Sequence, residues 1–599
     1  MPSILGIVAV LLALCFLPWP YRFLRNLYYA RKSGVPVIIL PWDQDNPLWI
    51  VISVPLRPVL QKILPKVVFE RIVLAIYGWE FHDKLRPFEQ YAAPQGNDKT
   101  FFLATAGLSE ITTRDPEVAW QIVSRPRDFQ QAQWIAAFVS SAGPLRYHTR
   151  YKLQRKIITS VINERVSKVI FGESLKHTSS MMGEVFDKAD GNAAESTEVF
   201  NMMKKITINV LAGGAMGQDV TWDSDKDDKP RPGYKMTYMQ STKTVIEAVA
   251  GPIILPIWFL KAYPSFLPGH KLISELGVAI EEFPAHTKHL MQVETERAER
   301  DSGHTRSNIA SQLLRANRGD DKSHASLTDE ELMGNLFVVS AAGFDTTANT
   351  LSYALALLCR YPEIQDWMFE EVDELLSDDM GDDLDYVAVF PRVVRIMAIM
   401  LETLRLFVPV VHLAKETHGP QVIETSAGTL RAPASCTMYV DVVGLHLIPE
   451  IWRDLNLSGI EAEAKKATNV DENALADEHV FRPARWVNPT GSAQPLYQPP
   501  RGCYMPWSGG PRICPGQKMA QVEFTAIFLG LFRRHRIEAV PLQIDGHDER
   551  VFERNARLDA IMKDSVSLLT LQMQGVYHAA DVSGAATGKG VNVRIIKRR

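Results

Sequence analysis

The stretch PWSGGPRICPGQKMA, residues 506–520, gathers glycines, prolines and an arginine around a single cysteine. Read outward from the cysteine, the spacing is Trp507, Gly510, Arg512, Cys514 and Gly516. At average residue frequencies such a pattern arises by chance about once in several million positions. The stretch is therefore no accident of composition, and the rest of the sequence must explain why a thiol stands between two conformationally permissive glycines.

The composition of the chain is that of a globular protein. Of its 599 residues 46% are hydrophobic and 22% charged, and the net charge of −4 argues against nucleic acid as a partner. The scarce, odd-numbered cysteines form no CxxC pair, which favours a reducing compartment and argues against a zinc site. They are Cys15, Cys359, Cys436, Cys503 and Cys514.

The N-terminus is the most apolar part of the chain. Residues 4–17 read ILGIVAVLLALCFL, and Trp19 and Tyr21 follow before a group of basic residues. A cleaved signal peptide is the alternative, but no positive charge precedes the run and no small-residue cleavage site follows it. The sequence therefore predicts an N-terminal membrane anchor and hinge over residues 1–44 and one catalytic domain over residues 45–599, held on the cytosolic side.

The longest helical pattern begins at Thr328, which forms a capping box with Glu331, and runs to a stop at Pro362. Its middle reads AAGFDTT, residues 341–347, where glycine, an acid and two threonines are weak helix formers. One interpretation is a kink with a solvated acid. The other is a widened helical turn that opens a groove, with Asp345 and Thr346 facing it.

A second helix is predicted at about Tyr386–Phe407 and carries Glu402 and Arg405 three positions apart. Such pairs usually lie on solvated faces and contribute little. Apolar neighbours predict burial here, and buried charges need further partners. Arg485, in FRPARW at residues 481–486, is the candidate that would complete a structural Glu–Arg–Arg cluster.

Most of the remaining chain has helical periodicity, and the predicted fold class is mainly α with small β-sheets (α+β). Short β-branched segments predict the strands: Phe101–Thr105, Gln421–Glu424 and Met438–Val443. Polar insertions predict surface loops over residues 219–233, 301–326 and 454–477.

Four motifs follow one another along the chain: AGxDTT, ExxR, FxPxRW and WxxGxRxCxG. Together they resemble the cytochrome P450 superfamily, the haem-thiolate monooxygenases, over roughly residues 45–575. The wording around the cysteine is most similar to fungal microsomal enzymes. The resemblance implies a haem b (iron protoporphyrin IX) held between the long central helix and the cysteine loop.

The resemblance also implies roles for the residues of the cysteine loop. Cys514 would be the iron ligand as a thiolate, which pushes electron density onto the metal. Gly510 and Gly516 would let the backbone pass close to the porphyrin and turn amide groups toward the sulfur. Trp507 would shield the sulfur from water, and Arg512 would neutralise a haem propionate.

Three further cofactor contacts follow from family position. Arg155 stands in a Tyr-x-x-x-Arg stretch where the family has Trp-x-x-x-Arg, and it is expected on a propionate. Lys415 stands where many members have another arginine, and it can supply charge but not a bidentate fork. His412 is expected either to help there or to lie on a surface loop.

Asp345 and Thr346 would take the family's oxygen-activation roles, with Thr346 hydrogen-bonding the oxygen and Asp345 relaying protons. The chain after Cys514 is too short for a fused reductase. An NADPH-dependent diflavin reductase on the same membrane is therefore the expected electron donor, with cytochrome b5 as an optional second one.

The predicted reaction is oxidation of a hydrophobic small molecule with O2 and NADPH-derived electrons. The expected setting is a tailoring step in fungal secondary metabolism, on a terpenoid, polyketide or peptide-derived substrate, at the endoplasmic reticulum membrane. Sterol or fatty-acid oxidation, a non-oxygenating haem-thiolate isomerase or dehydratase, and a haem-holding sensor remain as alternatives. The presence of Asp345 and Thr346 argues against the isomerase, and the anchor argues against the sensor.

Overall fold

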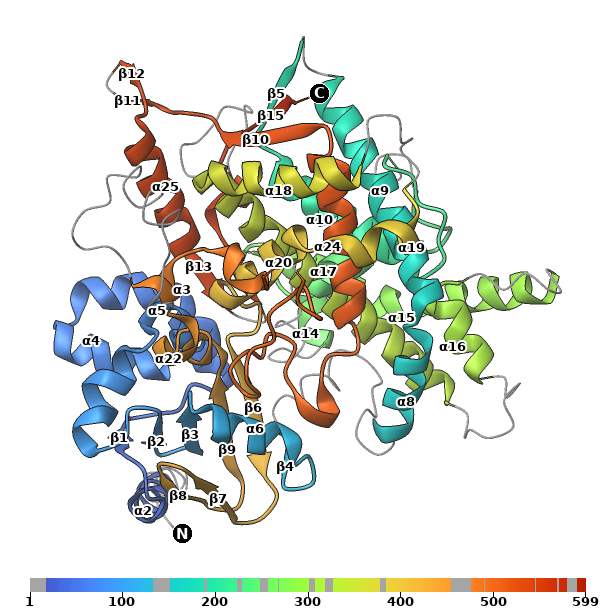
Figure 1. Ribbon diagram of the computed structural model, residues 1–599. Helices are drawn as coiled ribbons and strands as arrows, with labels where there is room; N and C mark the ends of the chain where they lie inside the picture. Colours follow the sequence, from blue (N-terminus) through green and yellow to red (C-terminus); the bar gives the residue numbers. More distant parts are fainter. Residues whose placement is uncertain are drawn as a thin grey trace.

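The computed structural model describes residues 18–132, 151–187, 191–223, 229–247, 257–267, 269–300, 307–317, 327–376, 384–453, 476–489, 491–544, 546–567, 570–578 and 590–598. Over these ranges the chain is mostly helical, and its main sheet lies to one side of the helices (Figure 1). The predicted mainly α fold class with small sheets is confirmed.

The central helix is α17 (Asp329–Arg360), which the long pattern predicted. Thr328 accepts a hydrogen bond from the Glu331 amide while the Glu331 carboxylate accepts one from the Thr328 amide, so the capping box is present. The second half of α17 is almost wholly buried, and both helices and strands pack against α17. This helix therefore crosses the core and can present side chains deep inside the molecule.

The helices around α17 form the larger part of the molecule (Figure 1). They are α8 (Tyr151–Val161), α9 (Glu164–Phe186), α10 (Val199–Val210), α12 (Tyr238–Glu247), α14 (Ile257–Ala262), α15 (His270–Arg300), α16 (Ile309–Asn317), α18 (Pro362–Leu375), α19 (Tyr386–Val389), α20 (Arg395–Leu406), α24 (Gln517–Phe532) and α25 (Val551–Lys563).

The main sheet has the strand order β1-β2-β3-β9-β6-β4. Its strands are β1 (Val37–Ile39), β2 (Thr100–Ala104), β3 (Ser109–Thr113), β4 (Phe129–Gln131), β6 (His412–Thr417) and β9 (Cys436–Asp441). The pairs β1–β2 and β3–β9 are parallel, and the other three neighbouring pairs are antiparallel. The sheet thus joins the N-terminal part of the chain to the segment that follows α20.

Smaller helices and hairpins complete the fold. The N-terminal helices are α2 (Pro18–Lys32), α3 (Pro47–Ile63), α4 (Lys66–Ile72), α5 (Trp79–Asp83) and α6 (Pro116–Ser124). Two short helices follow the sheet, α21 (Val442–Leu445) and α22 (Pro449–Trp452). The remaining strands are β5 (Ala193–Ser196), β7 (Gln421–Thr425), β8 (Gly428–Ala432), β10 (His535–Ala539), β11 (Gln543–Ile544), β12 (His547–Asp548), β13 (Ser565–Ser567), β14 (Leu571–Met573) and β15 (Val593–Lys597).

The predicted helix at about Tyr386–Phe407 is wrong in its extent. The chain forms α19, then a 3-10 turn at Phe390–Arg392, and only then α20. Pro391 explains the break, because proline has no amide hydrogen to donate and its ring clashes with a preceding helical turn.

The predicted anchor, residues 4–17, lies outside the described residues, as does nearly all of the predicted loop 454–477. The predicted loop 219–233 is described except at residues 224–228 and forms no helix or strand there. The predicted loop 301–326 is wrong in its middle, where the chain forms α16 (Ile309–Asn317). Within the described part of the chain, none of the helices combines the length and the apolar character that crossing a bilayer requires.

Candidate functional site

A cavity of about 380 Å³ lies between the middle of α17 and the loop that carries Cys514. The residues that line it are mostly apolar and come from α8, α17, α20, β6 and the start of α24. They are Arg155, Ile158, Ile162, Asn335, Val338, Val339, Ala342, Gly343, Thr346, Thr347, Thr350, Met400, Leu404, Pro409, Val410, Leu413, Pro506, Trp507, Ser508, Arg512, Cys514, Pro515, Gly516, Met519 and Ala520.

The cysteine loop is closed by its own backbone. The Cys514 amide donates to the Trp507 carbonyl at 2.9 Å, and the Ile513 amide donates to the Gly510 carbonyl at 3.2 Å. The Cys514 side chain is exposed, and it is exposed toward the cavity that it lines. The loop therefore presents one thiol to a mostly apolar space.

The environment of this thiol acts on its pKa in two directions. Burial raises the pKa of Cys514, while the backbone amides of Gly516 and Gln517 and the charge of Arg155 lower it, and the net shift is upward. The protein alone thus keeps the thiol protonated at neutral pH. A metal cation bound to the sulfur would reverse this, because coordination deprotonates a thiol outright.

The two glycines of the loop serve different purposes. Gly510 has φ of +61°, and a Cβ atom there would lie 2.6 Å from the Val123 carbonyl oxygen of α6. Gly510 therefore lets the loop approach α6 closely. Gly516 has φ of −86° and is the N-terminal cap of α24, with its amide directed at the Cys514 sulfur as expected.

Positive charge gathers at one edge of the cavity. Arg155 and Arg512 both line it, and Arg155 Nη2 donates to the Ile513 carbonyl at 2.5 Å. Lys415 does not line the cavity but lies behind Arg512, with its Nζ donating to Gln131 Oε1 at 3.1 Å. Burial, and then the charge of Arg512, lowers the pKa of Lys415 to about 8.

His412 does not reach the cavity. Successive side chains of a strand point to opposite faces, and its neighbour Leu413 lines the cavity. The His412 imidazole therefore points away, where its Nδ1 lies 2.7 Å from Glu80 Oε1 and its ring packs against Tyr77 and Tyr439. The structure therefore places His412 away from the cavity edge where it was expected to help. His412 is not a surface residue either, since its side chain is buried.

The cavity face of α17 carries Ala342, Gly343 and Thr346. The expected widened turn is wrong, because α17 is one continuous α-helix across these residues. Small residues line the cavity at this point, and Gly343 also lets Leu211 pack closely against the helix, since a Cβ there would lie 3.1 Å from the Leu211 side chain. Thr346 faces this space, and its Oγ1 donates to the Ala342 carbonyl at 2.7 Å.

Asp345 lies about 100° around the helix from Thr346 and is not among the residues that line the cavity. Its carboxylate accepts a hydrogen bond from the hydroxyl of Thr570, which precedes β14. Asn349 Nδ2 donates to the same hydroxyl oxygen at 3.1 Å, and the Tyr577 hydroxyl donates to Asn349 Oδ1 at 3.1 Å. In this state the acid is held by the C-terminal part of the chain, beside the cavity and outside it.

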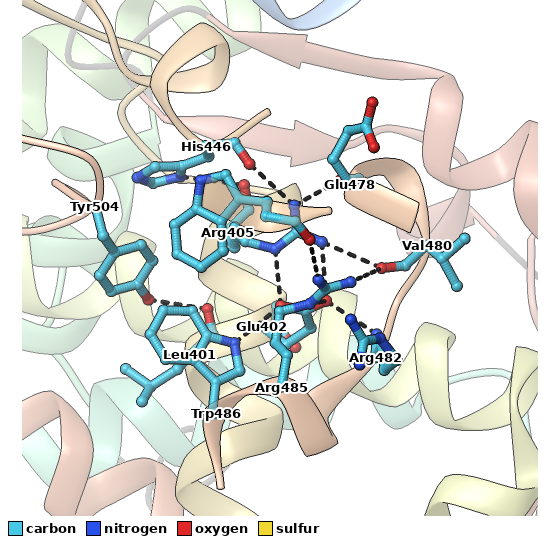
Figure 2. A network of polar contacts seen from close by, with 12 residues as sticks. Leu401, Glu402, Arg405, His446, Glu478, Val480, Arg482, Arg485, Trp486 and Tyr504 are labelled. Atoms are coloured by element: carbon cyan, nitrogen blue, oxygen red, sulfur yellow. Dashed lines mark hydrogen bonds and ion pairs between the residues drawn. The ribbon is translucent and has the colours of Figure 1, made fainter. Parts of the chain in front are cut away.

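Glu402, Arg405 and Arg485 come together in a buried cluster (Figure 2). Arg405 meets the Glu402 carboxylate with two hydrogen bonds of 2.8 and 2.9 Å, and Arg485 adds a third at 2.9 Å. Burial alone would raise the pKa of Glu402, but the two guanidinium groups outweigh it and lower that pKa to about 2.

The cluster is saturated with further partners that sequence reasoning missed. The second oxygen of Glu402 also accepts from the Trp486 indole at 2.9 Å, and Asp477 accepts from Arg485 at 3.2 Å. Arg405 donates to the carbonyls of His446, Glu478 and Val480 at 2.9, 2.6 and 3.1 Å (Figure 2).

His446 connects this cluster to the cysteine loop. Its Nδ1 lies 3.1 Å from the Arg405 carbonyl, and its Nε2 accepts the Met505 amide at 3.0 Å. Burial and the charge of Arg405 lower the pKa of His446 to about 3, so the ring stays neutral and can accept that amide. Nothing in the local sequence around His446 marks this contact, because its two partners are distant in the chain.

The chemistry of the cavity fits the expected haem. A thiol stands on one wall and small side chains stand on the facing helix, which suits a flat apolar ring with a metal at its centre. Arg155 and Arg512 at the edge suit its two acid groups, with Lys415 close behind.

Comparison with known proteins gives one family. The cytochrome P450 family model matches residues 123–454 and 467–551. A cytochrome P450 monooxygenase of the phomenoic acid biosynthesis cluster of Leptosphaeria maculans is 35% identical over 574 residues, which is 94% of this chain and 96% of the relative. The cytochrome P450 monooxygenase prx9 of Penicillium rubens is 22% identical, with 92% of this chain and 94% of the relative covered.

A solved structure supports the same fold. The crystal structure of the cytochrome P450DA heme domain superposes with a TM-score of 0.59 at 16% identity, and the match covers 86% of this chain and 94% of that one.

Proposed function

This chain belongs to the cytochrome P450 family of monooxygenases, and from that premise we propose that it oxidises an apolar small molecule in a tailoring step of fungal secondary metabolism. The mostly apolar lining of the cavity supports an apolar substrate. Relatives named for the phomenoic acid cluster and for prx9 support the biosynthetic setting, since each matches over nearly its whole length.

Haem is the cofactor of this family, and when bound it supplies the redox centre at which dioxygen is activated. We infer that Cys514 is its iron ligand, with the Gly516 and Gln517 amides directed at the sulfur to moderate its charge. Arg155 and Arg512 bind the acid groups of the ring, and Lys415 adds charge behind them. Trp507 covers the loop side of the cavity and keeps water from the sulfur.

Thr346 and Asp345 handle protons in this proposal. Thr346 presents its hydroxyl to the cavity and can hold a water molecule or an oxygen atom of the reactant there. Asp345 can deliver a proton only after its carboxylate leaves Thr570, since it is bound outside the cavity in the described state. Thr570 is therefore a positioning residue that sets when the acid is available.

Electrons would come from an NADPH-dependent diflavin reductase, with cytochrome b5 as an optional second donor. The apolar run at residues 4–17, followed by Trp19 and Tyr21, supports single-pass attachment to the endoplasmic reticulum membrane with the catalytic domain in the cytosol. Sterol or fatty-acid oxidation is the alternative within the same chemistry.

The observation that carries the proposal is a single thiol, Cys514, opening onto an apolar cavity opposite Thr346. The test is the carbon monoxide difference spectrum of the reduced holoenzyme, followed by product analysis with terpenoid and polyketide precursors in the presence of NADPH and reductase. We expect the thiolate-type band together with an oxygenated product.

Cys514→Ser should lose the thiolate-type band and the product together, while Cys503→Ser, a buried thiol in the same region, should keep both. A Cys514→Ser protein that retains the band would refute the ligand assignment. If the enzyme turned over hydroperoxides without NADPH, its reaction would be that of a non-oxygenating haem-thiolate isomerase or dehydratase and not a monooxygenation.

A further inference from the structure

Asn335 places a polar group in an aliphatic part of the cavity. It lies in the first half of α17 and is only 4% exposed, and it lines the cavity beside Val338 and Val339 of the same helix. From α8, Ile158 lines the cavity as well. A buried amide among aliphatic side chains costs free energy unless its polar atoms have hydrogen-bond partners.

The Asn335 amide has a partner for its nitrogen but none for its oxygen among the described residues. Its Nδ2 donates to the Glu331 carbonyl at 2.7 Å, one helical turn back. An amide rotated by half a turn would set two acceptor oxygens against each other, so the bond to Glu331 fixes which atom is left over. The side chain therefore presents an acceptor, Oδ1, to the cavity that it lines.

Helix stability does not explain an asparagine at this position. The Glu331 carbonyl already accepts the backbone amide of residue 335 within α17, so the side-chain bond satisfies no group that lacked a partner. Asparagine is also a weaker helix former than leucine or alanine, because its amide competes for backbone groups. The advantage of Asn335 must therefore come from what its oxygen binds.

Asn335 and Thr346 lie on the same face of α17. They are eleven positions apart, which is three turns plus about 20° around the helix and about 16 Å along its axis. Val339 and Ala342 lie between them on that face, and all four residues line the cavity. An elongated molecule lying along this face can place one end beside Thr346, opposite Cys514, and the other end at Asn335.

The chemistry of the cavity selects the group that Asn335 can bind. The group must donate a hydrogen bond, which a carboxylate cannot do. None of the described residues that line the cavity is an aspartate or a glutamate, so an ammonium ion would be buried there without a counter-charge. A single water molecule is a poor occupant, since buried waters typically make about three hydrogen bonds and the neighbours here are aliphatic. A neutral donor remains, and a hydroxyl group is the one that terpenoids and polyketides commonly carry.

We propose that the substrate carries a hydroxyl group at the end remote from the oxidised carbon, and that Asn335 Oδ1 accepts its hydrogen bond. The inference rests on the proposed function, since it concerns the substrate of the same cavity. Asn335 is then a specificity-determining residue, which selects a hydroxylated molecule over one of the same shape without a donor. The substrate reaches this enzyme with its hydroxyl group in place, so a hydroxyl-forming reaction must act on it beforehand.

The test measures the binding of two pairs of probe molecules to the holoenzyme, from the change in haem absorption during titration. Each pair is an alcohol and an ether that lacks the donor: 1-dodecanol with its isomer 1-methoxyundecane, and farnesol with farnesyl methyl ether. Asn335→Leu removes the amide at similar size, and Asn335→Ala is a second variant in case leucine disturbs the packing. Ser340→Ala is the matched control, because Ser340 makes the same type of bond, to the Leu336 carbonyl at 2.9 Å, and does not line the cavity. The carbon monoxide spectrum checks folding.

We expect the unchanged protein and Ser340→Ala to bind the alcohol of at least one pair about tenfold more tightly than the ether, as for one hydrogen bond to a buried acceptor. Both Asn335 variants should bind the alcohol and the ether equally. Absence of a preference in the unchanged protein, or a preference that survives both Asn335 variants, would overturn the inference and leave the proposed function standing. A holoenzyme without the thiolate-type band would instead refute the proposed function, and the inference with it.

Discussion

Two buried charges in this molecule, on Glu402 and Lys415, have lowered pKa values for opposite reasons. Burial works against the Glu402 carboxylate, but Arg405 and Arg485 overcome it and bring its pKa to about 2. Burial works against the Lys415 ammonium as well, and the nearby Arg512 adds to the effect, so its pKa falls to about 8. The first site stabilises its ionised form and the second destabilises it.

The difference separates a structural site from a binding site. Around Glu402 every strong donor already has its acceptor within the chain, so the cluster can hold the fold but has nothing left to offer a ligand. At the cavity edge, positive groups lie close to one another at an energetic cost. Such a cost is typical of a functional site, and under the proposed function these groups bind the acid groups of haem.

The largest effect is expected from Arg405→Met, which would leave Glu402 buried without its main partner. We expect the free energy of unfolding to fall by about 3–5 kcal/mol, as for other broken buried pairs. Denaturant titration followed by circular dichroism measures this. The control is Arg300→Met, whose pair with Glu296 is exposed on both sides, and which should leave the free energy of unfolding nearly unchanged. If both variants lost the same free energy of unfolding, the buried cluster around Glu402 would contribute no more to stability than an exposed ion pair.

Arg512→Gln tests the open site in the same way. It should leave the unfolding of the apoprotein nearly unchanged but speed the loss of haem to a scavenging apoprotein by roughly tenfold or more, because a charged hydrogen bond contributes about 1.5–3 kcal/mol. Arg501→Gln is the control, since Arg501 stacks on Trp120 and does not line the cavity. If Arg512→Gln destabilised the apoprotein instead, the cavity edge would be structural as well.

Thr570→Val tests whether the hydrogen bond from Thr570 controls proton delivery by Asp345. Losing this bond to Asp345 should change product formed per NADPH by up to about tenfold and alter the solvent isotope effect, since one such bond contributes about 1 kcal/mol. Thr570→Ser keeps the hydroxyl and should behave like the unchanged protein. Identical results for valine and serine would mean that Thr570 acts only through packing.

The smallest effect is a pH dependence from Lys415. Because its pKa is about 8 in the folded protein and 10.5 ordinarily, the unfolded chain binds more protons between these values. The stability of the apoprotein should therefore rise with pH from about 8 to about 10. Lys415→Met should flatten this rise, and bound haem should reduce it by supplying an anion. Urea titrations across this pH range would decide, and a rise unaffected by Lys415→Met would contradict the assignment.

The parts that sequence predicted well are those set by local spacing or by a paired charge. The capping box at Thr328 and the stop at Pro362 bound α17, because each acts within a few residues of itself. The apolar neighbours of Glu402 and Arg405 predicted that this pair is buried, and a buried pair needs a further partner. The FRPARW motif offered Arg485 as that partner, and Arg485 does pair with Glu402.

The incorrect predictions concerned the face of a helix or strand on which a side chain lies, and contacts between residues that are distant in the chain. Spacing put Asp345 next to Thr346, but one helical step turns it away from the cavity toward Thr570, far along the chain. His412 was predicted to help at a propionate because it lies close to Lys415 in the sequence, and strand alternation points it toward Glu80 instead. His446 has no motif, because its role depends on two backbone groups that only the folded chain brings together.

The fit of Gly510 against the Val123 carbonyl bears on how the protein is made. The loop that carries the sulfur is located by α6, which is synthesised well before the loop itself. A nascent chain that has not yet reached residue 510 has one wall of the pocket and no sulfur to face it. Cofactor capture through the sulfur therefore requires that synthesis has passed Cys514, and a bulkier residue at 510 would hinder it by displacing the loop from α6.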